Sequence, residues 1–173
     1  MTSPKRNILI TGLPGVGKTT FIKKVSDELR NFQPVGFYTA EIREKGVRRG
    51  FELIGFDGRR GILSHTDIKG FHRVGKYGVD IRGFEDLLDS IPFLNPATNL
   101  IIIDEIGKME CLSHKFRELI IKILDSEKPV IASIALKSSE FIEEIKKRDD
   151  VRLLEITKSN RESLVPDVLK LLD

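Results

Sequence analysis

Two periodicities of apolar residues alternate along the chain, one typical of buried strands and the other of amphipathic helices. Buried strands are predicted at residues 8–10, 100–103, 129–135 and 151–156. Helices are predicted up to about residue 31 and over residues 84–91, 113–126, 138–145 and 159–172. Ser138 and a capping box formed by Ser159 and Glu162 are expected to begin the last two helices. This alternation predicts a parallel sheet joined by right-handed crossovers.

The segment from about residue 35 to residue 64 interrupts the alternation with β-forming sequence. Three strands are predicted there, at residues 35–42, 49–56 and 60–64, and Asp57-Gly58 is typical of a hairpin turn. Residues 66–83 mix four glycines with basic residues. We expect them to form a flexible loop, which either closes over a polyphosphate or is an ordinary solvated surface loop. The fold class expected for residues 1–173 is α/β: a single domain, built as a three-layer sandwich around a mostly parallel central sheet, with a small antiparallel β insert.

Composition narrows the classes of protein that this chain can belong to. The 29 Lys and Arg residues and 26 Asp and Glu residues are interleaved, and the net charge of +3 argues against a nucleic-acid-binding module. One cysteine, Cys111, excludes an intramolecular disulfide; it is expected to be a buried small hydrophobe in a reducing compartment. No apolar stretch is long enough for a membrane span, and residues 1–6 lack the apolar core of a signal peptide. We therefore expect a cytoplasmic monomer without membrane association.

The most informative motif is the run Gly-Leu-Pro-Gly-Val-Gly-Lys-Thr at residues 12–19, which follows the first predicted strand and precedes a helix. It fits the phosphate-binding pattern G-x-x-x-x-G-K-[ST] at Gly12, Gly17, Lys18 and Thr19. Glycines allow successive backbone N–H groups to form a concave site for a phosphate, and the helix directs its positive end at the same group. Lys18 would reach the β- and γ-phosphates, and the Thr19 hydroxyl would help to coordinate Mg²⁺.

A second candidate site follows the apolar run at residues 100–103. Asp104 stands at the carboxyl end of that predicted strand, where its carboxylate could hold Mg²⁺ beside Thr19. Glu105 could polarise the attacking water as a general base. An Asp-Glu pair after a strand can also be an ordinary acidic helix start, but the upstream phosphate-binding motif favours the functional interpretation.

Charge on a transferred phosphoryl group usually requires a further cation besides the motif lysine. The sequence does not choose among the candidates, which are Arg43, Arg48, Arg49, Lys108 and Arg161. Ser133 and Lys137, at the end of the next strand, are candidates for sensing the terminal phosphate. The three histidines share no ligand spacing with one another or with Cys111, which argues against a transition-metal site.

Several stretches together resemble the small thermophile-type nucleoside-triphosphatases, also called the cancer-related nucleoside-triphosphatase family. The stretches are TGLPGVGKTT at residues 11–20, GFYTAEIR at 36–43, RGF at 49–51, DEIGKME at 104–110 and TKSNR at 157–161. The resemblance covers residues 7 to about 166 and is vaguest between 57 and 98. It implies a P-loop NTPase fold, RecA-like or kinase-like.

The resemblance also implies an activity: Mg²⁺-dependent removal of the terminal phosphate from ATP, GTP, CTP and UTP, with little base selectivity. The absence of a guanine-reading Asn-Lys-x-Asp sequence agrees with loose base selection. The residues expected to contact the nucleotide are Gly12, Leu13, Pro14, Gly15, Val16, Gly17, Lys18, Thr19, Thr20, Asp104, Glu105, Lys108 and Arg161. Glu105 and Lys18 are the expected catalytic residues, and Thr19 and Asp104 the expected metal ligands.

Two other functions stay open at this stage. The same residues could transfer phosphoryl to an alcohol, as in a small-molecule or nucleotide kinase, if water were excluded. The chain could also be a slow nucleotide-dependent switch whose hydrolysis controls binding to a protein or RNA partner. An acceptor site would favour the kinase, whereas stimulation by a partner would favour the switch.

Overall fold

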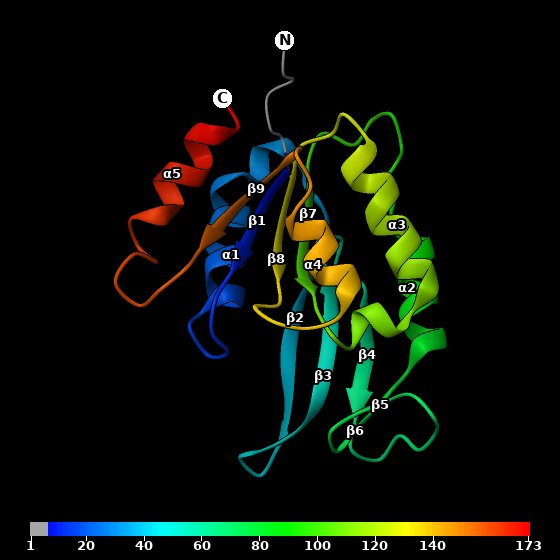
Figure 1. The fold of residues 1–173 in the computed structure, drawn as a ribbon. Helices are drawn as coiled ribbons and strands as arrows, with labels where there is room; N and C mark the ends of the chain where they lie inside the picture. The colour runs from blue at the N-terminus through cyan, green and yellow to red at the C-terminus, as the bar shows by residue number, and fades with distance from the viewer. Residues whose placement is uncertain (1–6) are drawn as a thin grey trace.

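Strands from both halves of the sequence join in one sheet. The computed structural model describes residues 7–173, and within them nine strands pair in the order β5-β6-β4-β3-β2-β7-β8-β1-β9 (Figure 1). They are β1 (Asn7–Thr11), β2 (Val35–Glu44), β3 (Val47–Gly55), β4 (Arg60–His65), β5 (Arg73–Val74), β6 (Tyr77–Val79), β7 (Ile101–Ile106), β8 (Val130–Ile134) and β9 (Val151–Glu155). Residues 1–6, for which no signal peptide is expected, lie outside the described residues.

Helices cover both faces of the parallel part of this sheet (Figure 1). They are α1 (Lys18–Glu28), α2 (Ile81–Ser90), α3 (His114–Asp125), α4 (Glu140–Lys146) and α5 (Leu164–Leu171), with short 3₁₀ helices η1 (Arg30–Phe32) and η2 (Glu110–Leu112). Successive strand residues point to opposite faces. Ile8 and Ile10 therefore pack with α1 and α5, whereas Leu9 packs with α3 and α4. The continuous apolar runs are thus buried on both faces, as their sequence predicts.

The small antiparallel insert is present, but the expectation that the central sheet is mostly parallel is wrong. Of the strand pairings among residues 7–173, four are parallel and four are antiparallel, so the sheet is mixed. The physical reason is the length of β2. Its first three residues, Val35 to Phe37, pair in parallel with β7, and the strand then continues beyond β7 to pair antiparallel with β3. The three expected strands are present, but they extend the central sheet beyond the end of β7.

Residues 66–83 also differ from the expected flexible loop. They contain the short hairpin of β5 and β6, and β6 pairs with β4, as in Ser64 with Val79. The helix that follows begins earlier than predicted, at Ile81, because the Asp80 side chain caps it by accepting a hydrogen bond from the Gly83 amide (2.9 Å).

Some of the predicted helix starts agree with the structure and others do not. The helix predicted from residue 113 begins there, because Ser113 caps α3 and its hydroxyl accepts a bond from the Phe116 amide (3.1 Å). The capping box expected at Ser159 is wrong, because α5 begins only at Leu164. The intervening turn is held instead by Asn160, whose side-chain oxygen accepts a bond from the Thr157 amide (2.7 Å). Similarly, α4 begins at Glu140 with Ser139 rather than Ser138 as its N-cap, and α1 ends at Glu28 before η1.

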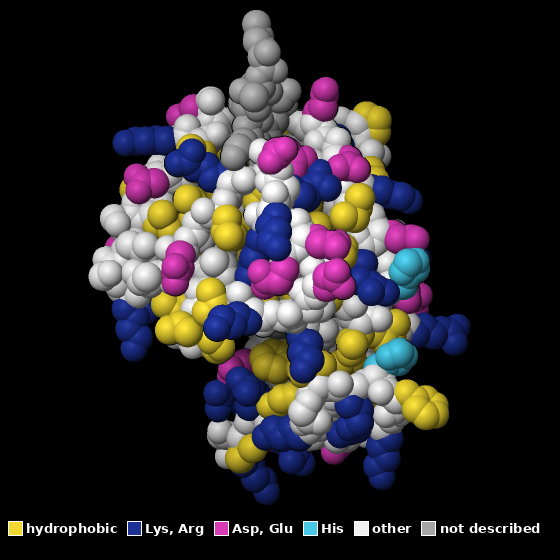
Figure 2. All heavy atoms as spheres, viewed as in Figure 1, with side chains coloured by type: hydrophobic (Ala, Val, Ile, Leu, Met, Phe, Trp, Pro, Cys, Tyr) yellow, Lys and Arg dark blue, Asp and Glu magenta, His cyan; other side chains and the backbone are white. Residues whose placement is uncertain are grey.

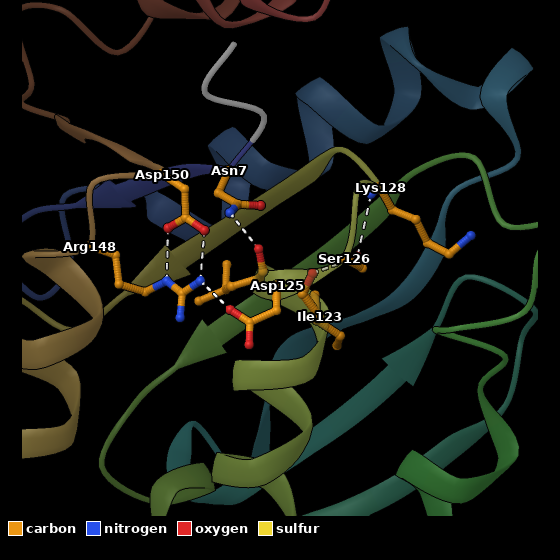
Figure 3. A network of polar contacts seen from close by, with 8 residues as sticks. Asn7, Ile123, Asp125, Ser126, Lys128, Arg148 and Asp150 are labelled. Carbon is orange, nitrogen blue, oxygen red and sulfur yellow. Dashed lines mark hydrogen bonds and ion pairs between the residues drawn. The ribbon is translucent and has the colours of Figure 1, made fainter. Parts of the chain in front are cut away.

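A polar network joins the elements at the amino ends of the parallel strands (Figure 3). The Arg148 guanidinium donates to both carboxylate oxygens of Asp150 (2.8 and 2.7 Å) and to Asp125 at the end of α3 (2.6 Å). Asn7, the first residue of β1, donates to the Leu124 carbonyl (3.0 Å). These contacts fix the end of α3 against the start of β1 and β9.

None of the helices in the described part of the chain combines the length and apolar character needed to cross a membrane.

Candidate functional site

The glycine-rich motif forms the turn between β1 and α1. Gly15 and Gly17 have φ values of 79° and 104°, a left-handed conformation that glycine adopts without the steric strain of a side chain. Gly12 is required for another reason, because a Cβ there would lie 2.7 Å from the carbonyl oxygen of Ile156. The turn therefore lies close against the end of β9 and leads directly into the N-terminus of α1, where unpaired amides favour an anion.

Asp104 is buried at the carboxyl side of β7 and faces this turn. Its carboxylate accepts hydrogen bonds from the hydroxyls of Thr19 (2.8 Å) and Ser133 (2.6 Å), and from the backbone amide of Thr39 (3.2 Å). The Thr39 hydroxyl in turn donates to the Asp104 carbonyl oxygen. The expected metal ligands, Thr19 and Asp104, are therefore in direct contact, and β2 and β8 hold the carboxylate from either side.

Lys18 and Glu105 lie together at the opening of the same turn. The Lys18 ammonium is 3.1 Å from a carboxylate oxygen of Glu105, and the side chains are 13% and 30% exposed. The two expected catalytic residues therefore form an ion pair that substrate can reach. A phosphate oxygen bound to Lys18 would compete with this carboxylate.

One cavity of about 600 Å³ brings most of the expected site residues together. Its lining includes Gly12, Pro14, Gly15, Lys18, Thr19, Asp104, Glu105 and Lys108. On the far side it is bounded by the antiparallel strands, through Thr39, Glu41, Arg48 and Phe51. Lys137 also lines this cavity, and Ser133 reaches it indirectly through its bond to Asp104.

A family model described as NTPase matches residues 7–169. This chain belongs to the NTPase family. The nucleoside-triphosphatase THEP1 of Thermotoga sp. (strain RQ2) is 52% identical over 166 residues, or 95% of this chain and 94% of that protein. The cancer-related nucleoside-triphosphatase of Homo sapiens is 39% identical over 182 residues, or 95% of each chain. The crystal structure of THEP1 from Aquifex aeolicus superimposes with a TM-score of 0.88 at 38% identity, and covers 96% of this chain and 99% of that one.

Membership of the NTPase family confirms the family predicted from the sequence, and the solved structure confirms the α/β fold class. The superposition with that structure covers nearly the whole of both chains. The antiparallel strands that bound the cavity are thus included in the likeness.

The remaining expected nucleotide contacts of this NTPase-family chain lie away from the Asp104 cavity. Leu13 and Val16 face a second cavity, of about 310 Å³, together with Glu155 to Lys158. Thr20 and Arg161 line a third, smaller cavity, and the Arg161 guanidinium is 3.5 Å from the Val16 carbonyl oxygen. The glycine-rich turn therefore has cavities on different sides, one beside Asp104 and one beside the loop after β9.

Glu110 is a buried residue whose carboxyl group lines the Asp104 cavity, and it is not among the site residues predicted from the sequence. Its side chain accepts a hydrogen bond from the Gly107 amide (3.2 Å). Burial raises the pKa of Glu110 well above its usual value, and the charges of Glu105 and Asp104 add to the effect. A Cβ on Gly107 would lie within 2.8 Å of both Glu110 and Glu105 carboxyl oxygens, so both side chains pack against this glycine. Local sequence gives little signal for such burial, since Glu110 follows two polar or flexible residues.

Cys111 is buried as expected, and burial raises the pKa of its thiol to about 12, with a further contribution from the charge of Glu110. Within residues 7–173 there is no cluster of three His, Cys, Asp or Glu side chains suited to a metal ion. The Thr19 hydroxyl and the Asp104 carboxylate lie in contact beside the glycine-rich turn.

Proposed function

We propose that this chain hydrolyses nucleoside triphosphates to nucleoside diphosphates and phosphate, with Mg²⁺ and with broad base specificity. The observation that carries the proposal is the contact of Thr19 with the buried Asp104, beside the Lys18–Glu105 pair and in one cavity with the glycine-rich turn. The names of the relatives support the same activity.

The phosphates would be held by the turn and the start of α1. Gly12, Gly15 and Thr19 line the cavity at the turn, and Lys18 supplies a positive charge on a side chain that is only 13% exposed. On substrate binding, we expect Lys18 to exchange the Glu105 carboxylate for oxygens of the β- and γ-phosphates. This exchange keeps the lysine paired and leaves Glu105 able to accept a proton.

The residues at the end of β7 fit a hard cation. Asp104 is 1% exposed, and its partners are two hydroxyls and an amide, so the carboxylate carries a negative charge that these contacts leave uncompensated. Oxygen ligands of this kind suit Mg²⁺, and Thr19 with Asp104 would hold it. When bound, Mg²⁺ neutralises charge on the β- and γ-phosphate oxygens.

Glu105 is the proposed general base. It follows Asp104 directly and faces the cavity, where its carboxylate can accept a proton from the water that attacks the terminal phosphorus. Lys108 lies in the same cavity and adds positive charge at its opening. Two consecutive residues therefore have different proposed roles: Asp104 would hold the metal, and Glu105 would act as the base.

Broad base specificity is supported by the cavity on the other side of the turn. It is lined by Leu13, Pro14 and the loop Glu155 to Lys158, and most of these residues are exposed to solvent. Arg161 lies near this end, against Val16. Backbone contacts to phosphates and an exposed surface for the base do not distinguish strongly among ATP, GTP, CTP and UTP.

The proposal is tested by incubating the protein with Mg²⁺ and each of the four triphosphates, and by measuring free phosphate without any acceptor. We expect turnover with all four. Formation of nucleoside diphosphate and a phosphorylated alcohol, without free phosphate, would instead support a kinase, whose acceptor could lie against the apolar residues Phe51, Leu63 and Val74 of the cavity lining. Very slow turnover that a protein or RNA partner stimulates would support a switch.

Two variants test the assigned roles. Glu105→Gln should bind nucleotide nearly as well as the unsubstituted protein and slow turnover by about 10²- to 10⁴-fold, because it removes the general base. Lys18→Ala should abolish binding or turnover. Full activity of Glu105→Gln, measured as initial rates over a range of ATP concentrations, would exclude Glu105 as the base.

A further inference from the structure

The structure separates the cations that could stabilise the transferred phosphoryl group. Within the described residues, those that line the cavity of Lys18 and Asp104 are Arg48, Lys108 and Lys137. Those outside its lining are Arg43, Arg49 and Arg161. Lys and Arg side chains are numerous over the antiparallel strands (Figure 2), where residues 35–83 hold ten of them against six Asp and Glu. These strands therefore carry a net positive charge, and Arg48 is the one of their ten cations that lines the cavity.

Arg48 is the candidate that its surroundings hold in place. Its Nε donates to the Tyr77 hydroxyl (2.9 Å), and its Nη1 donates to Glu41 (3.4 Å). The guanidinium carbon lies 5.2 Å from the ring centre of Phe51 and 5.8 Å from that of Tyr77. By contrast, no hydrogen bond or ion pair within residues 7–173 holds the side chain of Lys108 or Lys137. A preorganised cation stabilises developing charge better than one that must first be ordered.

We propose that Arg48 is a catalytic residue that contacts the terminal phosphoryl group in the transition state. The inference rests on the proposed hydrolysis. The water oxygen forms a bond to the terminal phosphorus, and Glu105 takes the proton. The bond from that phosphorus to the bridging oxygen breaks, and the nucleoside diphosphate leaves with the electron pair. Arg48 reaches the oxygens of the transferred group from the β3 side, opposite the glycine-rich turn.

The contacts around Arg48 allow this use. Neither of its hydrogen bonds within residues 7–173 involves Nη2, so one arm of the planar guanidinium is available to a phosphate oxygen. Its bond to Tyr77 is to a neutral hydroxyl. Glu41 also pairs with Arg43, at 2.7 and 2.8 Å, so this carboxylate keeps a cation when Arg48 turns toward substrate. Tyr77 is then a positioning residue for Arg48.

The test compares Arg48→Gln with Arg49→Gln in the full chain, by initial rates of ATP hydrolysis with Mg²⁺. Arg49 is the matched control, because it is the next residue of β3 and pairs with Glu44 outside the cavity lining. We expect Arg48→Gln to lower kcat by about 10²- to 10³-fold with KM changed only a few-fold, as for removal of a transition-state donor. Arg49→Gln should stay within about twofold in both constants.

A transition-state mimic separates catalysis from folding. ADP with Mg²⁺ and aluminium fluoride should bind far more weakly to Arg48→Gln, whereas ADP alone should bind it as well as the unsubstituted protein. Tyr77→Phe should give a smaller loss in kcat, with KM unchanged. An Arg48→Gln variant with unchanged kcat and unchanged affinity for the mimic would overturn the proposal and leave the hydrolase intact. Absence of ATP turnover in the unsubstituted protein would overturn both.

Discussion

The two ends of the parallel strands carry polar networks that differ in charge balance. At the amino ends, Arg148 lies between the carboxylates of Asp150 and Asp125 (Figure 3). Hydrogen bonding to Asp150 raises the pKa of Arg148, burial opposes this, and the bond to Asp125 adds to it. The bond from Arg148 also lowers the pKa of Asp150. This network therefore stays ionised at neutral pH, and both of its carboxylates are in direct contact with a cation.

At the carboxyl ends, the central carboxylate is paired differently. Asp104 is more buried than either aspartate of the other network, yet its partners Thr19, Ser133 and Thr39 are uncharged. A buried charge with such partners destabilises a fold unless something else compensates it. The amino ends therefore serve stability, whereas under the proposed function the uncompensated carboxylate at the carboxyl ends would hold a cation beside the nucleotide. The same substitution at the two ends should therefore have opposite consequences.

The largest effect is expected for Asp104→Asn. Loss of the carboxylate should lower ATP turnover by about 10²- to 10³-fold, which corresponds to several kcal/mol of lost transition-state stabilisation. More Mg²⁺ should be needed for half-maximal activity. The free energy of unfolding should change by less than about 1 kcal/mol, because the charge removed has no cationic partner among the described residues. Steady-state kinetics over a Mg²⁺ titration and urea unfolding measure both.

Asp125→Asn is the matched control at the amino ends. It removes a carboxylate that Arg148 contacts at 2.6 Å, so it should lower stability slightly and leave kcat and the Mg²⁺ requirement unchanged. Equal losses of activity in the two Asn variants would contradict the division of roles between the two ends.

The sequence was sufficient to predict the parallel half and the core of the candidate site. Residues 8–10 and 100–103 are apolar on both faces, so they indicate buried strands directly, and the spacing of Gly12, Gly17 and Lys18 is specific. Because both strands end at the same edge of a parallel sheet, the proximity of Thr19 and Asp104 followed from their positions. These features depend on local patterns, which sequence periodicity detects well.

The rest depends on contacts between distant residues. Nothing local shows that β2 continues past β7, because this depends on its pairing with β3 over eight residues. The hairpin of β5 and β6 has only five residues in strands and is fixed by pairing with β4. Arg48 looked like Arg43 and Arg49 in sequence; its contact with Tyr77, 29 residues away, is what distinguishes it.

A smaller effect is expected at the amino ends, where Arg148 is the shared cation of the network. Arg148→Met should lower the free energy of unfolding by about 1–2 kcal/mol, because it leaves Asp150 and Asp125 without their shared cation. For a chain of this length, the melting temperature should fall by about 2–6 °C. ATP turnover below the transition should match that of the unsubstituted protein.

Arg152→Met is the control for this change, because Arg152 is an exposed arginine of β9 close to Arg148 in sequence. It should leave the melting temperature within about 1 °C. A loss of turnover in Arg148→Met at a temperature where the protein is folded would show that the amino-end network also shapes the site.

The smallest effect is expected at Glu110, which lies at the carboxyl ends but is neither a proposed ligand nor a proposed base. Burial raises its pKa in the folded state above the ordinary value of 4.5. The folded protein therefore binds this proton more tightly than the unfolded chain does. Its contribution to stability is complete below about pH 4.5 and is lost as the pH rises toward the folded-state pKa.

Glu110→Gln should remove this loss, because its amide is neutral at every pH and its oxygen can accept the bond from the Gly107 amide. In urea unfolding at pH 5 and pH 8, the variant should gain stability relative to the unsubstituted protein as the pH is raised. Glu28→Gln, at the exposed end of α1, is the control and should differ from the unsubstituted protein equally at both pH values. A stability difference for Glu110→Gln that is the same at pH 5 and pH 8 would show that Glu110 is ionised in the folded protein. The carboxyl ends would then hold a further uncompensated charge beside Asp104, which would widen the contrast with the amino ends.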